Sequence, residues 1–128
     1  MDFKAAAKEL VSKMTFAEKI AQMQHDAPAI ERLGVPAYSW WNECLHGVAR
    51  AGAATVFPQA IGMAASFNAD RMYEVATAIS DEARGKYNEY KKQYGTTPMY
   101  HGLNFWSPNI NIFRDPRWGR GHETYGED

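Results

Sequence analysis

The sequence contains almost no cysteine: Cys44 is the only one in 128 residues. A single thiol cannot form a disulfide within the chain, so the sequence neither requires nor excludes an oxidising compartment. No apolar run approaches the roughly 20 residues that a membrane span needs, and Lys4, Lys8 and Glu9 interrupt the first turns, where a secretory signal would be apolar. We therefore expect a soluble protein without a membrane partner, with the cytoplasm favoured and secretion left open.

An excess of either charge is also lacking. The chain has 14 Lys and Arg against 15 Asp and Glu, a formal net charge of −1. Without a basic surplus, we expect no nucleic-acid partner. The length suits one ordinary domain and falls far short of the roughly 250 residues of a complete (β/α)8 barrel. It therefore indicates either one compact domain or a piece of a larger one.

Aromatic residues, in contrast, are abundant, at 13% with four Trp and seven Tyr. Flat amphipathic rings suit the apolar faces of sugars, but they are also ordinary core residues. Composition alone favours core packing.

Local signals predict three helices. Asp2 can cap a first helix that runs through Met14. Thr15 and Glu18 form a T-x-x-E capping box that opens a second helix, through about Met23. Asn68 can cap a long third helix that extends to about Tyr94, where Gly95 is a stop signal. One face of this long helix is apolar, with Met72, Val75, Ala76, Ile79, Ala83, Tyr87 and Tyr90.

Short apolar runs between the helices predict strands. Residues 35–41 and 103–106 have the pattern of buried strands, and residues 54–57 form a second short apolar stretch. Residues 61–65 fit either a strand or a helical turn. Strands that alternate with helices are the α/β pattern, in which a parallel sheet carries working loops at its strand ends. Three or four strands are too few to close a barrel, so the chain is expected to be part of a larger domain.

Two stretches combine charged and amide groups with aromatic rings, which suits a sugar subsite. They are YSWWNECLHGVAR at 38–50 and FWSPNINIFRDPRWGRGHETYGED at 105–128. Together they resemble the N-terminal barrel domain of family 3 glycoside hydrolases, of the β-xylosidase or β-glucosidase kind. The connecting segments MTFAEKIAQM and TVFPQAIGMAAS are similar to that family too, so the likeness covers nearly the whole chain.

This resemblance implies a fold and an activity. Residues 1–128 would be the N-terminal portion of an incomplete TIM (β/α)8 barrel, and their partner would be the remainder of a parent chain. The parent would be a retaining, exo-acting β-glycosidase that hydrolyses terminal non-reducing sugars. Its substrates would be xylo- or gluco-oligosaccharides or aryl β-glycosides, and no cofactor or metal is implied.

The resemblance also assigns substrate-binding residues. Arg120, in the W-G-R triplet, would hold hydroxyls of the terminal sugar. The alternative for Arg120 is a salt bridge with Glu123 or Glu127 that only ties the loop. Glu43 would bind the distal hydroxyls, and its alternative is a loop carboxylate that faces solvent.

Glu43 also bears on specificity. Glucosidase-like members present a shorter Asp in a D-G-P turn, whereas W-N-E-x-L-H-G is similar to the xylosidase and arabinosidase branch. A longer carboxylate would occupy the room that the exocyclic CH2OH of glucose requires, which favours xylose. Trp106 would narrow the same subsite, with core packing as its alternative. A β-xylosidase is therefore expected, with a β-glucosidase of the same family as the alternative.

No catalytic residue is expected among the 128. The family takes its nucleophile from an Asp in an S-D-[WY] setting after a later barrel strand, and its acid/base from the following domain; no S-D-[WY] occurs here. Asp115 is expected to support Arg117 or loop amides, and Glu123 to orient Arg120. The isolated chain should therefore be inactive. The remaining alternative is a truncated, non-catalytic module for sugar binding or assembly.

Other site types fit less well. The possible metal ligands match none of the strong zinc spacings; they are Glu43, Cys44, His46 and His122. Cys44 and His46 lack an orienting third group, which argues against a nucleophilic pair. An RNA-binding loop of Arg114, Arg117, Arg120 and Trp118 is opposed by the acidic end of the chain.

Overall fold

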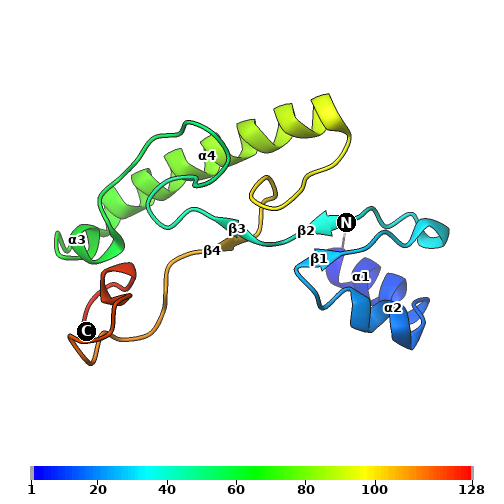
Figure 1. The fold of residues 1–128 in the computed structure, drawn as a ribbon, viewed down its shortest axis with the longest axis horizontal. Coiled ribbons are helices and arrows are strands. Elements are labelled where there is room, and N and C mark those ends of the chain that lie inside the picture. The colour runs from blue at the N-terminus through cyan, green and yellow to red at the C-terminus, as the bar shows by residue number, and fades with distance from the viewer. Residues whose placement is uncertain (1, 128) are drawn as a thin grey trace.

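A computed structural model describes residues 2–127 (Figure 1). Its helices are α1 (Phe3–Ser12), α2 (Phe16–Ala21), α3 (Ala60–Ala64) and α4 (Ala69–Tyr94), with 3-10 helices η1 (Glu31–Leu33) and η2 (Gly121–Glu123). Its strands are β1 (Asp26–Ala27), β2 (Tyr38–Ser39), β3 (Asn42–Glu43) and β4 (Phe105–Trp106). β1 pairs with β2 antiparallel, and β3 pairs with β4 parallel.

The first two helices begin where their capping residues predict. Oδ1 of Asp2 accepts hydrogen bonds from the backbone N–H groups of Lys4 and Ala5, at 3.0 and 3.1 Å. Thr15 and Glu18 form both halves of the predicted capping box. Both helices end about two residues earlier than predicted. Hydrogen bonds from Arg32 and from the Thr15 amide lower the pKa of Glu18 to about 2, so this carboxylate ties α2 to η1 as well as capping it.

The apolar side of these two helices is uncovered within residues 2–127. Neither α1 nor α2 contains a buried residue, and Phe16 of α2 and Met23, just beyond α2, are each 79% exposed. α1 and α2 also lie at the opposite end of the long axis from α3 (Figure 1). The total accessible surface is 9252 Å², whereas a compact monomer of this mass exposes about 6,800 Å². The described chain therefore leaves unusually much surface open.

Residues 35–41 do not form one buried strand, and this prediction was wrong. Within this segment only Tyr38–Ser39 is a strand, paired with β1, and the next strand, Asn42–Glu43, begins just after the segment and pairs with β4. Between the two strands, the amide of Trp40 donates to the carbonyl of His25 at 2.9 Å. An apolar run cannot reveal a change of partner, because its pattern looks the same whichever strand lies beside it.

Residues 54–57 do not form a strand either. Polar side chains from α4 hold this segment: Glu82 accepts from the backbone N–H of Thr55 at 3.1 Å and from its hydroxyl at 2.6 Å. Lys86 donates to the carbonyl of Ala51 at 3.0 Å. The ambiguous residues 61–65 lie in and just beyond α3 (Ala60–Ala64), so the helical alternative is correct.

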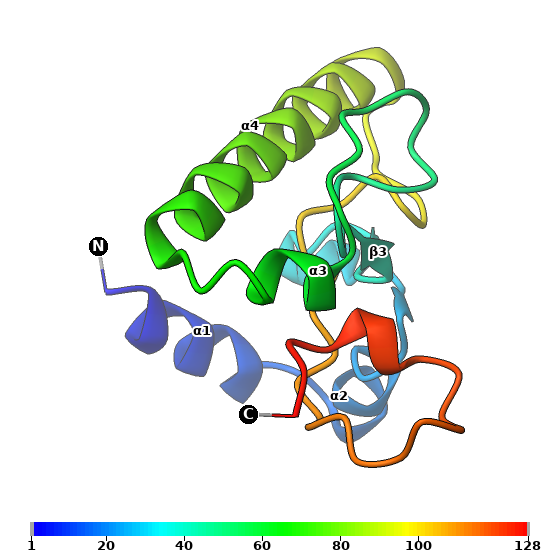
Figure 2. The same ribbon diagram turned by 90° about the vertical axis from the view of Figure 1, so that its left-hand side faces the viewer.

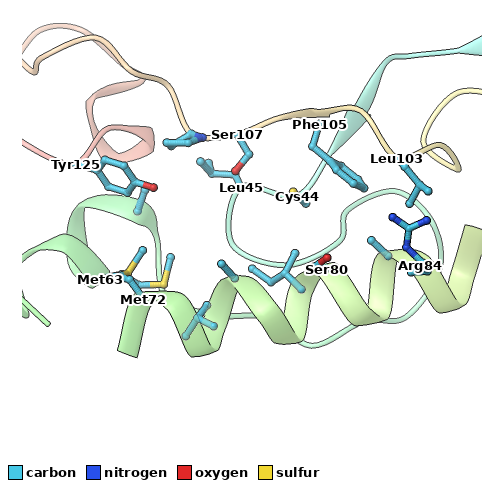
Figure 3. Close-up of a pocket in the computed structure, with 16 residues that line it drawn as sticks. Cys44, Leu45, Met63, Met72, Ser80, Arg84, Leu103, Phe105, Ser107 and Tyr125 are labelled. Atoms are coloured by element: carbon cyan, nitrogen blue, oxygen red, sulfur yellow. The ribbon is translucent and has the colours of Figure 1, made fainter. Parts of the chain in front are cut away.

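The long helix matches its prediction at both ends. Oδ1 of Asn68 accepts from the backbone N–H of Arg71 at 2.9 Å, and Gly95 ends the helix with a left-handed φ of 75°. Its residues Ile79 and Ala83 pack with Val48 in a small buried cluster. Beside this cluster, an apolar cavity of about 320 Å³ lies between α4 and the β3–β4 segment (Figure 3).

The β3–α3–α4–β4 succession is an α/β arrangement, because the two strands are parallel and helices connect them. Figure 2 shows α3 and α4 following one another on the same side of β3. Within residues 2–127 the strands form two two-stranded sheets and no closed barrel. Among the described residues, no helix has both the length and the apolar character needed to cross a membrane.

Candidate functional site

A second cavity, of about 820 Å³, lies at the ends of β3 and β4. It brings together the predicted residues Glu43, Trp106 and Arg120, which come from both quoted stretches of the sequence. The rest of its wall consists of Leu45, His46, Gly47, Ala49, Arg50, Phe105, Ser107, Pro108, Asn109, Ile110, Asn111 and Glu123. We call this cavity the polar cavity.

Glu43 reaches the polar cavity because it is the last residue of β3. Successive strand residues face opposite sides, so its neighbour Asn42 is fully buried while the Glu43 side chain keeps 33% of its surface exposed. One carboxylate oxygen, Oε2, accepts from Nε of Arg50 at 3.0 Å. Within residues 2–127, the other oxygen has no hydrogen-bond partner. Glu43 therefore has an acceptor available for a ligand.

Arg120 stands at the start of η2 and is paired with Glu123. Its Nε donates to Oε1 and Oε2 of Glu123 at 3.0 and 2.9 Å, and Nη2 also donates to Oε2. These contacts lower the pKa of Glu123 and raise the pKa of Arg120, to which the negative charge of Glu43 also contributes. The Arg120 side chain is 65% exposed. Such exposed pairs contribute only about 0–1 kcal/mol to stability. The contact exists as expected, and the role of Glu123 in orienting the guanidinium stays a prediction.

The loop that carries Arg120 folds back on itself. The amide of Asn109 donates to the carbonyl of Glu123 at 3.1 Å, and that of Phe113 donates to the carbonyl of Gly126 at 3.0 Å. Gly121 lies so close to the ring of Phe113 that an added Cβ would clash with it. These contacts bring the far end of the loop beside the strand ends, and so place Arg120 near Glu43.

Trp106 pairs in register with Glu43 and lies on the wall of the polar cavity. Its ring centroid is 5.6 Å from that of Trp41 and 6.1 Å from that of Trp40, in tilted arrangements. Its exposed fraction is 56%, so the described residues do not bury it in a core. The role of its ring toward a ligand stays a prediction.

Asp115 lies away from the polar cavity wall and is paired with Arg117. Its carboxylate accepts from Nε of Arg117 at 3.0 Å, from Nη2 at 2.7 Å and from the Arg117 amide at 2.9 Å. The same contacts lower the pKa of Asp115. Asp115 therefore closes a local turn in the loop.

Cys44 and His46 face different surroundings. Cys44 lines the apolar cavity, where burial raises the pKa of its thiol. His46 lines the polar cavity, with Nδ1 at 2.7 Å from the carbonyl oxygen of Phe57 and Nε2 at 3.3 Å from Nε2 of Gln59. In the part of the chain that the structure describes, no group of three His, Cys, Asp or Glu residues is arranged to hold a metal.

Two residues of the site were not predicted. Arg50 contacts Glu43, and Asn42 links β3 to the chain before β4. A strand predicted to extend past Trp41 would have placed Asn42 on the face opposite to Glu43. Arg50 had no such signal.

The polar cavity combines three groups that suit a polyol. It has a carboxylate with an available acceptor oxygen, a guanidinium with available donors, and the exposed indole ring of Trp106. Charged groups make the strongest hydrogen bonds to hydroxyls, and aromatic rings suit the apolar faces of sugars. The arrangement is therefore suited to holding a sugar.

Comparison with known proteins yields a family match over residues 5–128, to the "Glycosyl hydrolase family 3 N terminal domain". The chain is 53% identical to "Probable beta-D-xylosidase 7" of Arabidopsis thaliana, over 95% of this chain and 16% of that protein. It is 48% identical to "Xylan 1,4-beta-xylosidase" of Xylanibacter ruminicola, over 98% of this chain and 15% of that protein. The chain thus spans only about one sixth of the length of these relatives.

Proposed function

Because the chain belongs to glycoside hydrolase family 3, we propose that residues 1–128 are the N-terminal part of the catalytic (β/α)8 barrel domain of an exo-acting β-xylosidase. The parent enzyme hydrolyses terminal, non-reducing β-linked xylose with retention of configuration. Its substrates are xylo-oligosaccharides and aryl β-xylosides. The remainder of the parent chain completes the barrel and supplies the nucleophile and the acid/base.

The meeting of Glu43, Trp106 and Arg120 on one cavity is the observation that carries this proposal. These residues lie up to 77 positions apart in sequence, and they lie together because β3 and β4 are adjacent and the 107–126 loop folds back. The names of the relatives favour xylose over glucose. The accessible surface left open by residues 2–127 supports a barrel that further strands complete.

Each residue has a distinct role in the proposed site. Arg120, oriented by Glu123, donates to hydroxyls of the terminal sugar, and Glu43 accepts from the distal hydroxyls through its available oxygen. Trp106 offers an exposed ring at the same end of the sheet. Retaining hydrolysis needs two carboxyl groups about 5 to 5.5 Å apart that attack and protonate the glycosidic bond. Glu43 and Glu123 are both engaged with arginines, and we assign Glu43 to binding and Glu123 to orienting Arg120.

Kinetics on the complete reading frame test this function. The complete enzyme is expected to release p-nitrophenol from p-nitrophenyl β-D-xyloside with a higher kcat/KM than from the β-D-glucoside. The purified, mass-verified 128-residue chain is expected to be inactive on both, because it lacks the bond-cleaving carboxylates. A strong preference for the glucoside would replace the proposal with a β-glucosidase, and activity of the isolated chain would contradict the assignment of catalysis to later residues.

Shortening Glu43 tests the steric basis of the xylose preference. The Glu43→Asp substitution in the complete enzyme withdraws the carboxylate by one methylene and opens room for an exocyclic CH2OH. We expect the xyloside-to-glucoside ratio of kcat/KM to fall by about 10-fold, since one methylene in a pocket contributes about 1–3 kcal/mol to discrimination. Asp115→Asn, which alters a carboxylate outside the polar cavity, is the control. An unchanged ratio in Glu43→Asp would count against the steric explanation.

A further inference from the structure

Arg50 is held in an unusual place beside Glu43. Its backbone has a left-handed φ of 61°, a conformation that few non-glycine residues adopt. The loop before it is closed by a hydrogen bond from the Ala49 amide to the Glu43 carbonyl, at 2.9 Å. Gly47 permits this closure, because its φ is 125° and an added Cβ would clash with the backbone of Thr55. The loop therefore turns back and delivers residue 50 next to residue 43.

A tyrosine supports the same guanidinium from another direction. Cζ of Arg50 lies 5.4 Å from the centroid of the Tyr100 ring, within the range of a cation–π contact. Tyr100 itself has a left-handed φ of 72°, and its amide donates to the carbonyl of Trp41 at 3.0 Å. Two of the three non-glycine residues with positive φ in residues 2–127 thus meet at this one contact.

The contribution of the Arg50–Glu43 ion pair to folding stability is too small to explain why Arg50 adopts a left-handed backbone. The Arg50 side chain is 61% exposed, and such pairs contribute about 0–1 kcal/mol. A left-handed non-glycine residue disfavours folding by a comparable or larger amount. Backbone outliers of this kind concentrate where a side chain must be held in one place for function.

We propose that Arg50 is a positioning residue for Glu43, a role that rests on the proposed sugar-binding function. Its guanidinium, backed by Tyr100, holds Oε2 of Glu43, which lines the polar cavity, and leaves Oε1 available as an acceptor. A carboxylate fixed in this way cannot swing aside for a CH2OH group. Arg50, which also lines the polar cavity, therefore enforces the selection of pentosides over hexosides through its hold on Glu43.

Substituting Arg50 in the complete enzyme tests this role. With Arg50→Met, the xyloside-to-glucoside ratio of kcat/KM is expected to fall by about fivefold, and the KM for the xyloside to rise more than kcat falls. Arg50→Lys keeps the charge and is expected to retain part of the ratio. It also provides the measurement if the Met variant does not fold. Tyr100→Leu is expected to give an intermediate ratio, because the ring no longer backs the guanidinium.

The matched control is Arg71→Met. Arg71 is similarly exposed and paired with Glu74, but it lies on α4 away from the polar cavity. Loss of an exposed ion pair alone should leave the substrate ratio unchanged in this variant. An equal fall of the ratio in Arg71→Met and Arg50→Met would overturn the proposal.

A double-substitution cycle with Glu43→Gln separates the positioning role of Arg50 from the proposed sugar-binding role of Glu43. If Arg50 acts through Glu43, Arg50→Met will have little further effect on the ratio in a Glu43→Gln background. Full additivity, or an unchanged ratio in both Arg50 variants, would overturn the positioning role. If Glu43→Gln itself keeps the kcat/KM of the unaltered enzyme for the xyloside, the proposed sugar-binding function fails, whatever Arg50 does.

Discussion

Replacing Arg120 with alanine is expected to lower the kcat/KM of the complete enzyme for p-nitrophenyl β-D-xyloside by about 100- to 1,000-fold. Hydrogen bonds to a charged group contribute about 1.5–3 kcal/mol each, and every 1.36 kcal/mol is a factor of ten in rate. The substitution also leaves the carboxylate of Glu123 without its partner beside Glu43, which adds repulsion in the same cavity. Steady-state kinetics measure the loss of kcat/KM, and a melting curve measures the loss of stability that the repulsion between Glu123 and Glu43 causes.

The same loop offers a matched control for Arg120. Arg117 is paired with Asp115 much as Arg120 is paired with Glu123, yet Arg117 does not line the polar cavity. Arg117→Ala is therefore expected to leave kcat/KM within about twofold of the unaltered enzyme. Equal losses in the two variants would mean that Arg120 only ties the loop, the alternative that its exposed salt bridge suggests.

Replacing Asn42 with alanine is expected to loosen the junction between β3 and β4 by about 2–4 kcal/mol. The side chain of Asn42 is fully buried, accepts from the Gly102 amide at 2.8 Å and donates to the Asn104 carbonyl at 2.9 Å. Removing it leaves the buried Gly102 donor and the partly buried Asn104 acceptor without this partner, and a buried group without a partner disfavours the folded state by about 1–3 kcal/mol. Hydrogen exchange of the peptide spanning residues 99–106 in the complete enzyme measures this local opening.

Asn104→Ala is the control for Asn42. The Asn104 side chain is exposed, and only its backbone carbonyl joins the network. Protection of the 99–106 peptide should change little in this variant. If Asn42→Ala kept full protection as well, the buried amide network would not be what joins the two strands that carry Glu43 and Trp106.

Helices α1, α2 and α4 were predictable from the sequence because their signals are local. Asp2, the Thr15–Glu18 capping box and the Asn68 and Gly95 caps each act within a few residues, and each lies at an observed helix end. The strands were harder to predict, because each is only two residues long and forms by pairing with a segment that is distant in sequence. Residues 35–41 illustrate this, since the change of partner after Ser39 depends on β1 and β4.

In the site too, the residues in recognisable sequence stretches were predicted, whereas a contact that depends on the fold was not. Glu43, Trp106 and Arg120 belong to stretches whose residue types suit sugar binding, and the structure brings them to one cavity. The contact between Arg50 and Glu43 could not be read from the sequence, because it depends on a left-handed backbone at an arginine. Residue types and motifs can thus indicate what a cavity binds, whereas its supporting contacts depend on backbone turns.

The proposed site has Glu43 and Arg120 together holding the terminal xylose, and a crystal structure of the complete enzyme with bound xylose tests this most directly. Sugar hydroxyls are expected within hydrogen-bond distance of Oε1 of Glu43 and of the Arg120 guanidinium, with Oε2 of Glu43 still on Arg50. Xylose bound at the catalytic centre with neither side chain in contact with it would contradict the proposed role of both residues.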